Sequence, residues 1–144
     1  MLQTAIDLIA AGRYTCVMVQ EGRVALAMRG VGVRPLVFAR QSGRPLLSGA
    51  QIADKVIGKA AAVIAVLGGA SEVYGQVMSE SAVEYLDRFA IPHSCGALVP
   101  RIQNRTNTGL CPLEDSVKEI DDPALAFAAI ERRIAQLMSG AFKA

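Results

Sequence analysis

The chain has 144 residues, of which 52% are apolar and 19% charged, and its formal net charge is +2. This composition predicts one folded domain over residues 1–144 with one core, and it argues against intrinsic disorder. The small charge, the absence of Trp and the low aromatic content argue against nucleic acid and an anionic membrane surface as partners.

Neither a leader nor a membrane anchor is predicted. The N-terminal stretch MLQTAIDLIAAGRY has no basic region and its apolar run is interrupted by Asp7. The longest uncharged run in the apolar middle of the chain, residues 60–71, is shorter than the roughly 20 residues of a membrane span. Three cysteines without framework spacing are typical of free thiols. We therefore expect a soluble, cytoplasmic protein.

In the first half of the chain, apolar runs alternate with breaks rich in Gly and Pro. The predicted elements are a helix over 3–11, a hairpin of strands over 15–20 and 24–29, a loop with a short helical turn over 30–45, and a helix over 49–67. Ser48 is the predicted N-cap of that last helix, and Gly68-Gly69 its end.

The second half continues the alternation of strands and helices. The predicted elements are a strand over 72–78, an amphipathic helix capped by Ser79, a strand over 95–102 interrupted by Pro100, a loop over 103–110, a short helix from Pro112, and a last helix from Asp122-Pro123. A hairpin followed by helix–strand alternation favours an α/β fold in which helices flank a mixed sheet.

Polar residues interrupt the apolar pattern of residues 49–67 at Asp54, Lys55, Gly58 and Lys59. A helix-interior glycine costs about 1 kcal/mol relative to Ala, so Gly58 indicates close approach by another backbone or a ligand. Lys59 directly precedes the apolar run. It either faces a bound anion or extends its ammonium from the helix edge into water.

The segment NRTNTGLCPLED, residues 104–115, concentrates polar groups in a short loop. Cys111 is predicted at the start of a helix, where a thiol is a stronger nucleophile. Glu114 is three residues further on, at the reciprocal position of a capping box. One interpretation is an anion or nucleotide site with a reactive thiol. The other is a structural N-cap, with Arg105 paired to Asp115.

A zinc site is not expected. The chain has one histidine, His93, and no C-x-x-C pair, whereas catalytic zinc needs three protein ligands. Cys95 and Cys111 are the other available ligands, but His93 and Cys95 are predicted at a strand start with side chains facing different ways. Both Cys16 and Cys95 are expected to be buried and inert, which leaves Cys111 as the reactive thiol.

The stretches DKVIGKAAA (54–62), SESA (79–82) and NRTNTGLCPLE (104–114) together resemble domain-of-unknown-function family 1893, a group of small bacterial proteins. The resemblance covers about residues 3–135. It implies a three-layer cytidine deaminase-like fold, with a mixed sheet of four to five strands flanked by helices, and no established activity.

The resemblance also implies which deaminase residues are missing. Zinc deaminases carry His-x-Glu at the start of the helix after the hairpin and Pro-Cys-x-x-Cys after the next strand. With the predicted elements, the first position has Lys55, Gly58 and Lys59, and the second has Met78-Ser79-Glu80-Ser81. We therefore expect no zinc-dependent deaminase activity, no metal and no cofactor.

The sequence and the resemblance together predict a pocket for a nucleotide-like or phosphorylated small molecule. Its candidate binding residues are Asp54, Lys55, Gly58, Ser79, Glu80, Asn104, Arg105, Thr108 and Gly109. Whether the ligand is turned over stays open. In one alternative, a transferase or hydrolase uses Cys111 as nucleophile, Lys59 as electrostatic stabiliser, and Glu80 or Glu114 as base. The other alternative is a non-catalytic sensor or scaffold. A homo-oligomer is compatible with each.

Overall fold

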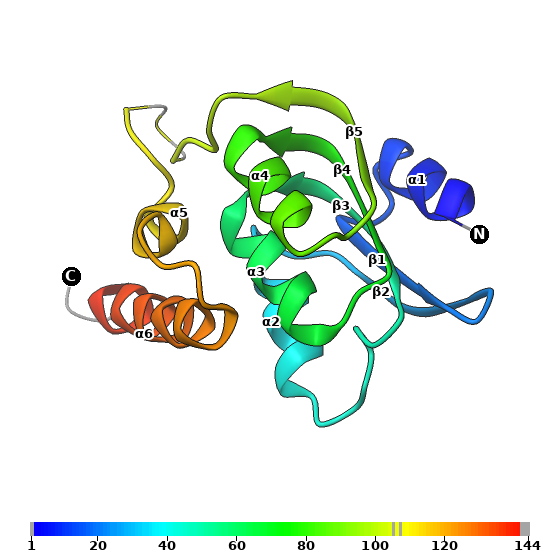
Figure 1. The fold of residues 1–144 in the computed structure, drawn as a ribbon, viewed down its shortest axis with the longest axis horizontal. Helices are drawn as coiled ribbons and strands as arrows, with labels where there is room; N and C mark the ends of the chain where they lie inside the picture. Colours follow the sequence, from blue (N-terminus) through cyan, green and yellow to red (C-terminus); the bar gives the residue numbers. More distant parts are fainter. Residues whose placement is uncertain (1, 105, 107, 142–144) are drawn as a thin grey trace.

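A five-stranded mixed sheet is the centre of the computed structural model, which describes residues 2–104, 106 and 108–141 (Figure 1). The elements are α1 (Leu2–Ala10), β1 (Cys16–Gln20), β2 (Arg23–Met28), α2 (Arg34–Gln41), β3 (Gln51–Ile57), α3 (Lys59–Gly68), β4 (Glu72–Ser79), α4 (Glu80–Arg88), β5 (His93–Val99), α5 (Pro112–Val117) and α6 (Pro123–Ala141).

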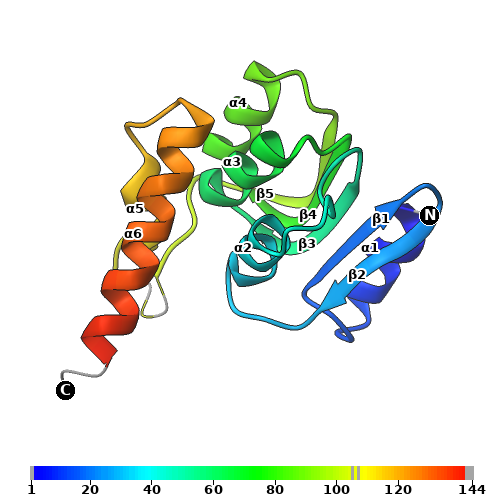
Figure 2. The ribbon, with the colours of Figure 1, turned by 90° about the horizontal axis from the view of Figure 1, so that it is seen from below.

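The strand order is β2-β1-β3-β4-β5. β1 pairs antiparallel with both β2 and β3, whereas β3, β4 and β5 are parallel. α1 packs on one face of the sheet and α2, α3 and α4 on the other, and α5 and α6 pack beside α3 (Figures 1 and 2). The predicted fold class, an α/β domain with helices on both faces of a mixed sheet, is confirmed.

The long helix predicted over 49–67 was wrong, because its first half is strand β3 and only α3 is helical. β3 lies between β1 and β4 and is covered on both faces, so Ile52, Ala53 and Ile57 are all buried. A strand buried on both faces has a continuous apolar run, which resembles a buried helix in sequence. Gly58 separates the two elements as the N-cap of α3.

The loop predicted over 30–45 contains an eight-residue helix, α2, with Pro35 in its first turn. Pro fits that position because its fixed φ suits a helix and the N–H it lacks would be unpaired there. The last strand is also displaced from the predicted 95–102. β5 begins at His93 and ends at Val99, before Pro100, which has no N–H for the strand ladder.

The predicted helix ends are found at three places. Ser79 accepts a hydrogen bond from the Ala82 N–H at 3.1 Å and caps α4. Gly69 ends α3 with φ of 82°, in the left-handed region that glycine adopts without strain. Pro112 begins α5. Among the described residues, no helix combines the length and apolar character needed to cross a bilayer.

Candidate functional site

The first turn of α3 is capped by a side chain from a distant part of the chain. The Glu114 carboxylate, on α5, accepts hydrogen bonds from the N–H of Lys59 at 2.7 Å and of Ala60 at 2.8 Å. A helix leaves its first N–H groups without internal partners and favours an anion there. Burial raises the pKa of Glu114, although both hydrogen bonds and Lys59 oppose that rise. An internal carboxylate thus occupies the anion position of α3.

This contact explains Gly58. A Cβ atom added at Gly58 would collide with the Glu114 carboxylate. The close approach expected at Gly58 is therefore made by a side chain of the protein itself, in place of the backbone or ligand that the sequence suggested. Glu114 was expected near the start of its own helix, but it caps α3 and leaves Cys111 as an N-cap without a side-chain hydrogen bond.

The Lys59 ammonium is also held internally. Its Nζ lies 2.9 Å from Asp121 Oδ1 and 3.3 Å from the Lys118 carbonyl oxygen, and 5.6 Å from the centre of the Tyr85 ring. Only 9% of the side chain is exposed, so Lys59 does not extend freely into water. Tyr85 donates a hydrogen bond to the Asp121 carbonyl at 2.7 Å.

Asp121 joins Lys59 to a second cation. Its Oδ2 lies 3.0 Å from Arg88 Nη1 on α4. The two cations lower the pKa of Asp121 through hydrogen bonds and charge. The carboxylate itself is half-exposed, so this pair of contacts faces an open space between α4 and α5.

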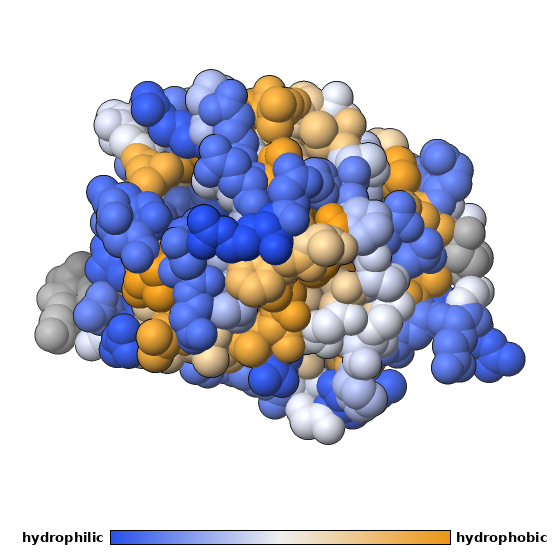
Figure 3. All heavy atoms as spheres, in the orientation of Figure 1, coloured by the Kyte–Doolittle hydropathy of each residue, from blue (hydrophilic) through white to orange (hydrophobic). Residues whose placement is uncertain are grey.

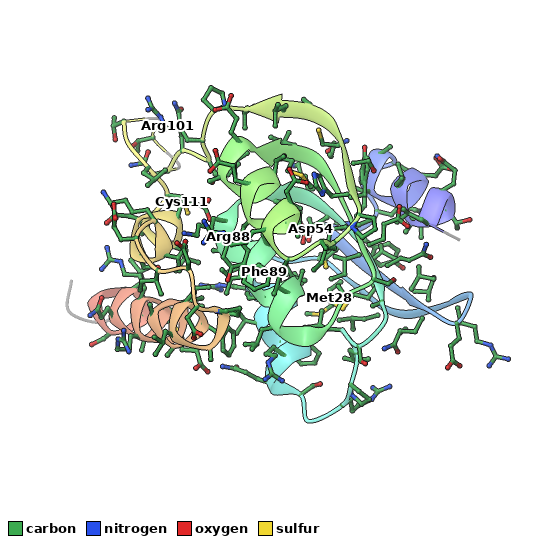
Figure 4. All side chains as sticks on the ribbon, in the orientation of Figure 1. Met28, Asp54, Arg88, Phe89, Arg101 and Cys111 are labelled. Carbon is green, nitrogen blue, oxygen red and sulfur yellow. The ribbon has the colours of Figure 1, made fainter. Side chains whose placement is uncertain are left out.

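That space is a cleft of about 390 Å³. Its walls are one side of α4, one side of α5 and the segments that follow β3, β5 and α5. The lining residues are Lys59, Ser81, Glu84, Tyr85, Arg88, Pro100, Arg101, Leu110, Glu114, Lys118 and Asp121. Figure 3 shows hydrophilic side chains gathered over the space between α4 and α5, and Figure 4 shows Arg88 and Arg101 on this side of the molecule.

The cleft lies where the three parallel strands end. Lys59, Ser81 and Arg101 each follow the last residue of β3, β4 or β5 by two positions. In open α/β sheets, ligands bind in the crevice outside the carboxyl ends of the strands. The position of this cleft therefore agrees with the general location of ligand sites in such sheets.

The loop over 103–110 forms its own hydrogen-bond network. The Asn104 side chain accepts from the Thr108 N–H at 3.0 Å and from the Thr106 hydroxyl at 3.2 Å. Asn104, Thr108, Gly109 and Cys111 are not among the cleft-lining residues, although Leu110 is. Arg105 lies outside the described residues.

In the first turn of α4, the residue that lines the cleft is Ser81, which was not a predicted site residue. Ser79 is fully buried and caps its own helix, and Glu80 is exposed outside the cleft lining. Ser81 lines the cleft, with its hydroxyl 3.0 Å from that of Ser79. Of this turn, Ser81 lines the cleft, whereas the two predicted residues, Ser79 and Glu80, do not.

Asp54 and Lys55 lie on β3 and are not among the cleft-lining residues. Figure 4 shows Asp54 apart from Arg101. Lys55 is exposed, whereas Asp54 is only 3% exposed. Asp54 Oδ1 accepts from the Val56 N–H at 3.2 Å, but Oδ2 has no hydrogen-bond partner among the described residues. Burial raises the pKa of Asp54 to about 7. Burial and the nearby Asp54 likewise raise the pKa of Cys16, its partner on β1.

The actual element boundaries change the comparison with zinc deaminases. The helix after the hairpin is α2, which begins Arg34-Pro35, and the turn after the next strand is Gly58-Lys59-Ala60. The residues compared with the deaminase motifs from the sequence alone therefore lie one helix further along the chain than the matching positions. The positions now identified carry neither His-x-Glu nor cysteines. Within the described ranges, no three His, Cys, Asp or Glu side chains gather in a way that could hold a metal ion.

Nine residues that line the cleft were not predicted from the sequence. They are Ser81, Glu84, Tyr85, Arg88, Pro100, Arg101, Leu110, Lys118 and Asp121. For α4 there was a usable signal, because Ser81, Tyr85 and Arg88 recur at helical spacing on one side of an amphipathic helix. No comparable signal marks Arg101 or Asp121, which lie in connecting segments.

The comparisons with known proteins agree with this architecture. A model of the family described as "Domain of unknown function (DUF1893)" matches residues 4–134. A solved structure of a DUF1893 family protein, TM1506 from Thermotoga maritima, is similar with a TM-score of 0.82 and 22% identity over 92% of this chain and 88% of that chain.

A weaker structural similarity is found to Acinetobacter baumannii RibD, form 2, with a TM-score of 0.46 and 18% identity over 66% of this chain and 34% of that chain. No curated protein matches the chain significantly in sequence. The match to the family model confirms the resemblance seen in the sequence. Since the family model matches most of the length of this chain, the chain belongs to the DUF1893 family.

Proposed function

We propose that this domain binds a small molecule with a phosphate or similar anionic group, nucleotide-like in size, in the cleft between α4 and α5. The observation that carries the proposal is the position of Arg101. It lines the cleft just beyond the end of β5, is exposed, and makes no ion pair with any described residue. Arginine is suited to phosphate recognition because its planar donors bind two oxygens together.

The other charges of the cleft indicate where the anion would lie. Glu114 caps α3 and Lys59 is neutralised by Asp121, so neither is free for a ligand. Arg88 shares Asp121 with Lys59 and is more than half exposed. We therefore assign the anionic group to Arg101 and Arg88, in place of the Lys59 contact expected from the sequence.

The size and lining of the cleft support a compact ligand. A volume of about 390 Å³ is near the lower end of the range for small-molecule pockets. Tyr85, Pro100 and Leu110 supply less polar surface beside the charged groups. An anionic group at one end and a flatter, less polar body are the features of a nucleotide.

The geometry gives less support to the Cys111-dependent enzyme. Cys111 does not line the cleft, and both oxygens of Glu114 accept hydrogen bonds from the α3 backbone. Using Glu114 as a base would remove the cap from α3. Substitution of Cys111 by Ser tests this alternative, since a nucleophile is essential for turnover but a binding site elsewhere is unaffected.

Substitution of Arg101 tests the proposal. In Arg101→Gln, loss of a charge-assisted hydrogen bond should weaken binding about tenfold, or about 1.5 kcal/mol. Isothermal titration with nucleoside monophosphates, sugar phosphates and inorganic phosphate measures this loss. The matched control is Arg23→Gln, which removes the same charge from the exposed start of β2.

Three results would count against the proposal. A wild-type protein that binds no compound in the panel would favour the sensor or scaffold alternative. Equal affinity in wild type and Arg101→Gln would place the ligand elsewhere. Loss of binding in both arginine variants would show only a dependence on overall charge.

A further inference from the structure

β5 is an edge strand with an uncovered outer side. It pairs with β4 alone, and no other described strand pairs with it. Its residues Ser94 to Leu98 are all exposed, including Leu98 at 56%. In Figure 3, orange spheres lie along the part of the upper rim where Figure 1 places β5, with hydrophilic residues to the left of them. An edge of this kind presents a row of free backbone donors and acceptors for another strand.

The opposite edge of the sheet is protected. β2 begins at Arg23 and is followed directly by Arg29, and both residues are exposed. Its pairing with β1 contains a register shift between Met18 and Val19. Flanking charges and bulges are common means by which proteins block pairing at a sheet edge. From Ser94 to Val99, β5 has neither a charged residue nor a proline, and the same holds for residues 24–28 of β2. The register shift is therefore the feature that distinguishes the β2 edge.

The charges at the two ends of β5 favour a second copy in antiparallel orientation. Asp87 lies at the start of the strand, with its Oδ1 3.4 Å from His93 Nε2. Arg101 follows the other end and is free of ion pairs within the described part of the chain. In an antiparallel pair, Arg101 of each copy lies near Asp87 of the other copy. The two-fold axis makes these two contacts equivalent. Parallel pairing would place like charges together.

We propose that two copies of this chain associate through β5, antiparallel and with a two-fold axis near Gly96, to form a continuous ten-stranded sheet from two five-stranded ones. The strand between the charged ends is uncharged, so the copies meet without like-charge contacts there. Arg101 also lines the cleft, so Asp87 of the second copy and the anionic ligand proposed above compete for the same side chain. The dimer forms without the ligand.

Charge substitution on β5 tests the interface. Ala97→Lys places a lysine on an exposed position of the strand next to the axis, so the chain should fold normally but present like charges on diagonal neighbours across the axis. We expect sedimentation equilibrium to show a wild-type dimer whose dissociation constant rises about tenfold in the variant. The matched control is Val24→Lys on the β2 edge, where the valine is 44% exposed; it should leave the dimer unchanged.

Chemical cross-linking reports the orientation independently. Antiparallel pairing near Gly96 places the exposed Cys95 of each copy close to the other, so a short bis-maleimide should link two chains. The link should persist in Cys111→Ser and disappear in Cys95→Ser.

A charge exchange, Asp87→Arg with Arg101→Asp, should restore the association that either single change weakens. A wild-type monomer, a link through Cys111, or equal weakening by Val24→Lys would each overturn the proposal.

Discussion

Asp54 is an unusual residue because its ionisable carboxyl group lies in the core and one of its oxygens has no hydrogen-bond partner in the described part of the chain. Burial raises its pKa from 3.8 to about 7, since removal from water disfavours the charged form. A raised carboxyl pKa means that the folded state holds the proton more tightly than the unfolded state. The contribution of this group to stability is therefore complete below about pH 4 and is lost as the pH rises through 7.

Asp54→Asn should remove this pH dependence. Relative to wild type, the variant should gain stability between pH 4 and pH 7 and no more above that, with a total gain on the order of 4 kcal/mol. Urea unfolding of both proteins across this range measures the difference, and the pH-independent cost of the amide cancels. Asp7→Asn, on the exposed side of α1, controls for the lost charge. A difference that does not change with pH would show that Asp54 ionises normally in the fold.

The thiols require a correction to the sequence prediction. Cys16 is buried as expected, but Cys95 is exposed, because β5 is an edge strand instead of an interior one. Cys111 is partly exposed. Burial raises the pKa of Cys16 and so reduces its reactive thiolate.

Alkylation at neutral pH should therefore modify Cys95 and Cys111 well before Cys16. Peptide mass mapping over a time course gives the order, and the same reaction in urea shows that all three thiols can react. Early labelling of Cys16 would mean that β1 opens to solvent in the native state.

At the level of secondary-structure elements, the junction of β3 and α3 depends on one carboxylate. Glu114 fills the space that a side chain at residue 58 would need, and Gly58 leaves that space open. The φ of Gly58, −101°, is accessible to any residue. Glycine is therefore required at residue 58 because a side chain would not fit there, and not because of the backbone conformation.

A double-mutant cycle should show this coupling. Gly58→Ala in the wild type should displace Glu114 from two backbone donors and cost about 2–4 kcal/mol. With Glu114 already changed to Ala, the same substitution should cost much less, because the new methyl group meets no carboxylate. Urea denaturation of the four proteins gives the coupling energy. Additive losses would mean that Gly58 is needed for another reason.

The sequence predicted those elements whose signals are local. Ser79 and Pro112 mark helix starts through their own chemistry, and the α4 stripe repeats at helical spacing. The 49–67 prediction failed because an apolar strand buried by its neighbours has no period of its own. The order of strands that buries β3 depends on contacts between distant segments. In the sequence, Gly58 was the one sign that a strand ends and a helix begins there.

For the molecule as a whole, the candidate site brings together segments that are distant in sequence. Lys59, Arg88 and Asp121 meet because β3, α4 and the segment before α6 converge. Lys59 and Glu114 were predicted site residues, but their partners are distant in the chain: the Glu114 carboxylate accepts from the N–H groups of Lys59 and Ala60, and the Lys59 ammonium bonds to Asp121. Local patterns carry no information about such contacts, so Arg101 and Asp121 could not be identified before the fold was known.

The cap on α3 also links the order of synthesis to the completion of the fold. The donors at Lys59 and Ala60 precede Glu114 by 55 and 54 residues. Chains are made from the N-terminus, and segments begin to fold as they emerge. The sheet strands and α3 are therefore synthesised while the start of α3 still lacks its carboxylate. A nascent chain that has not reached residue 114 has an unfilled anion position beside its core, and release of the segment from residue 114 onward closes it.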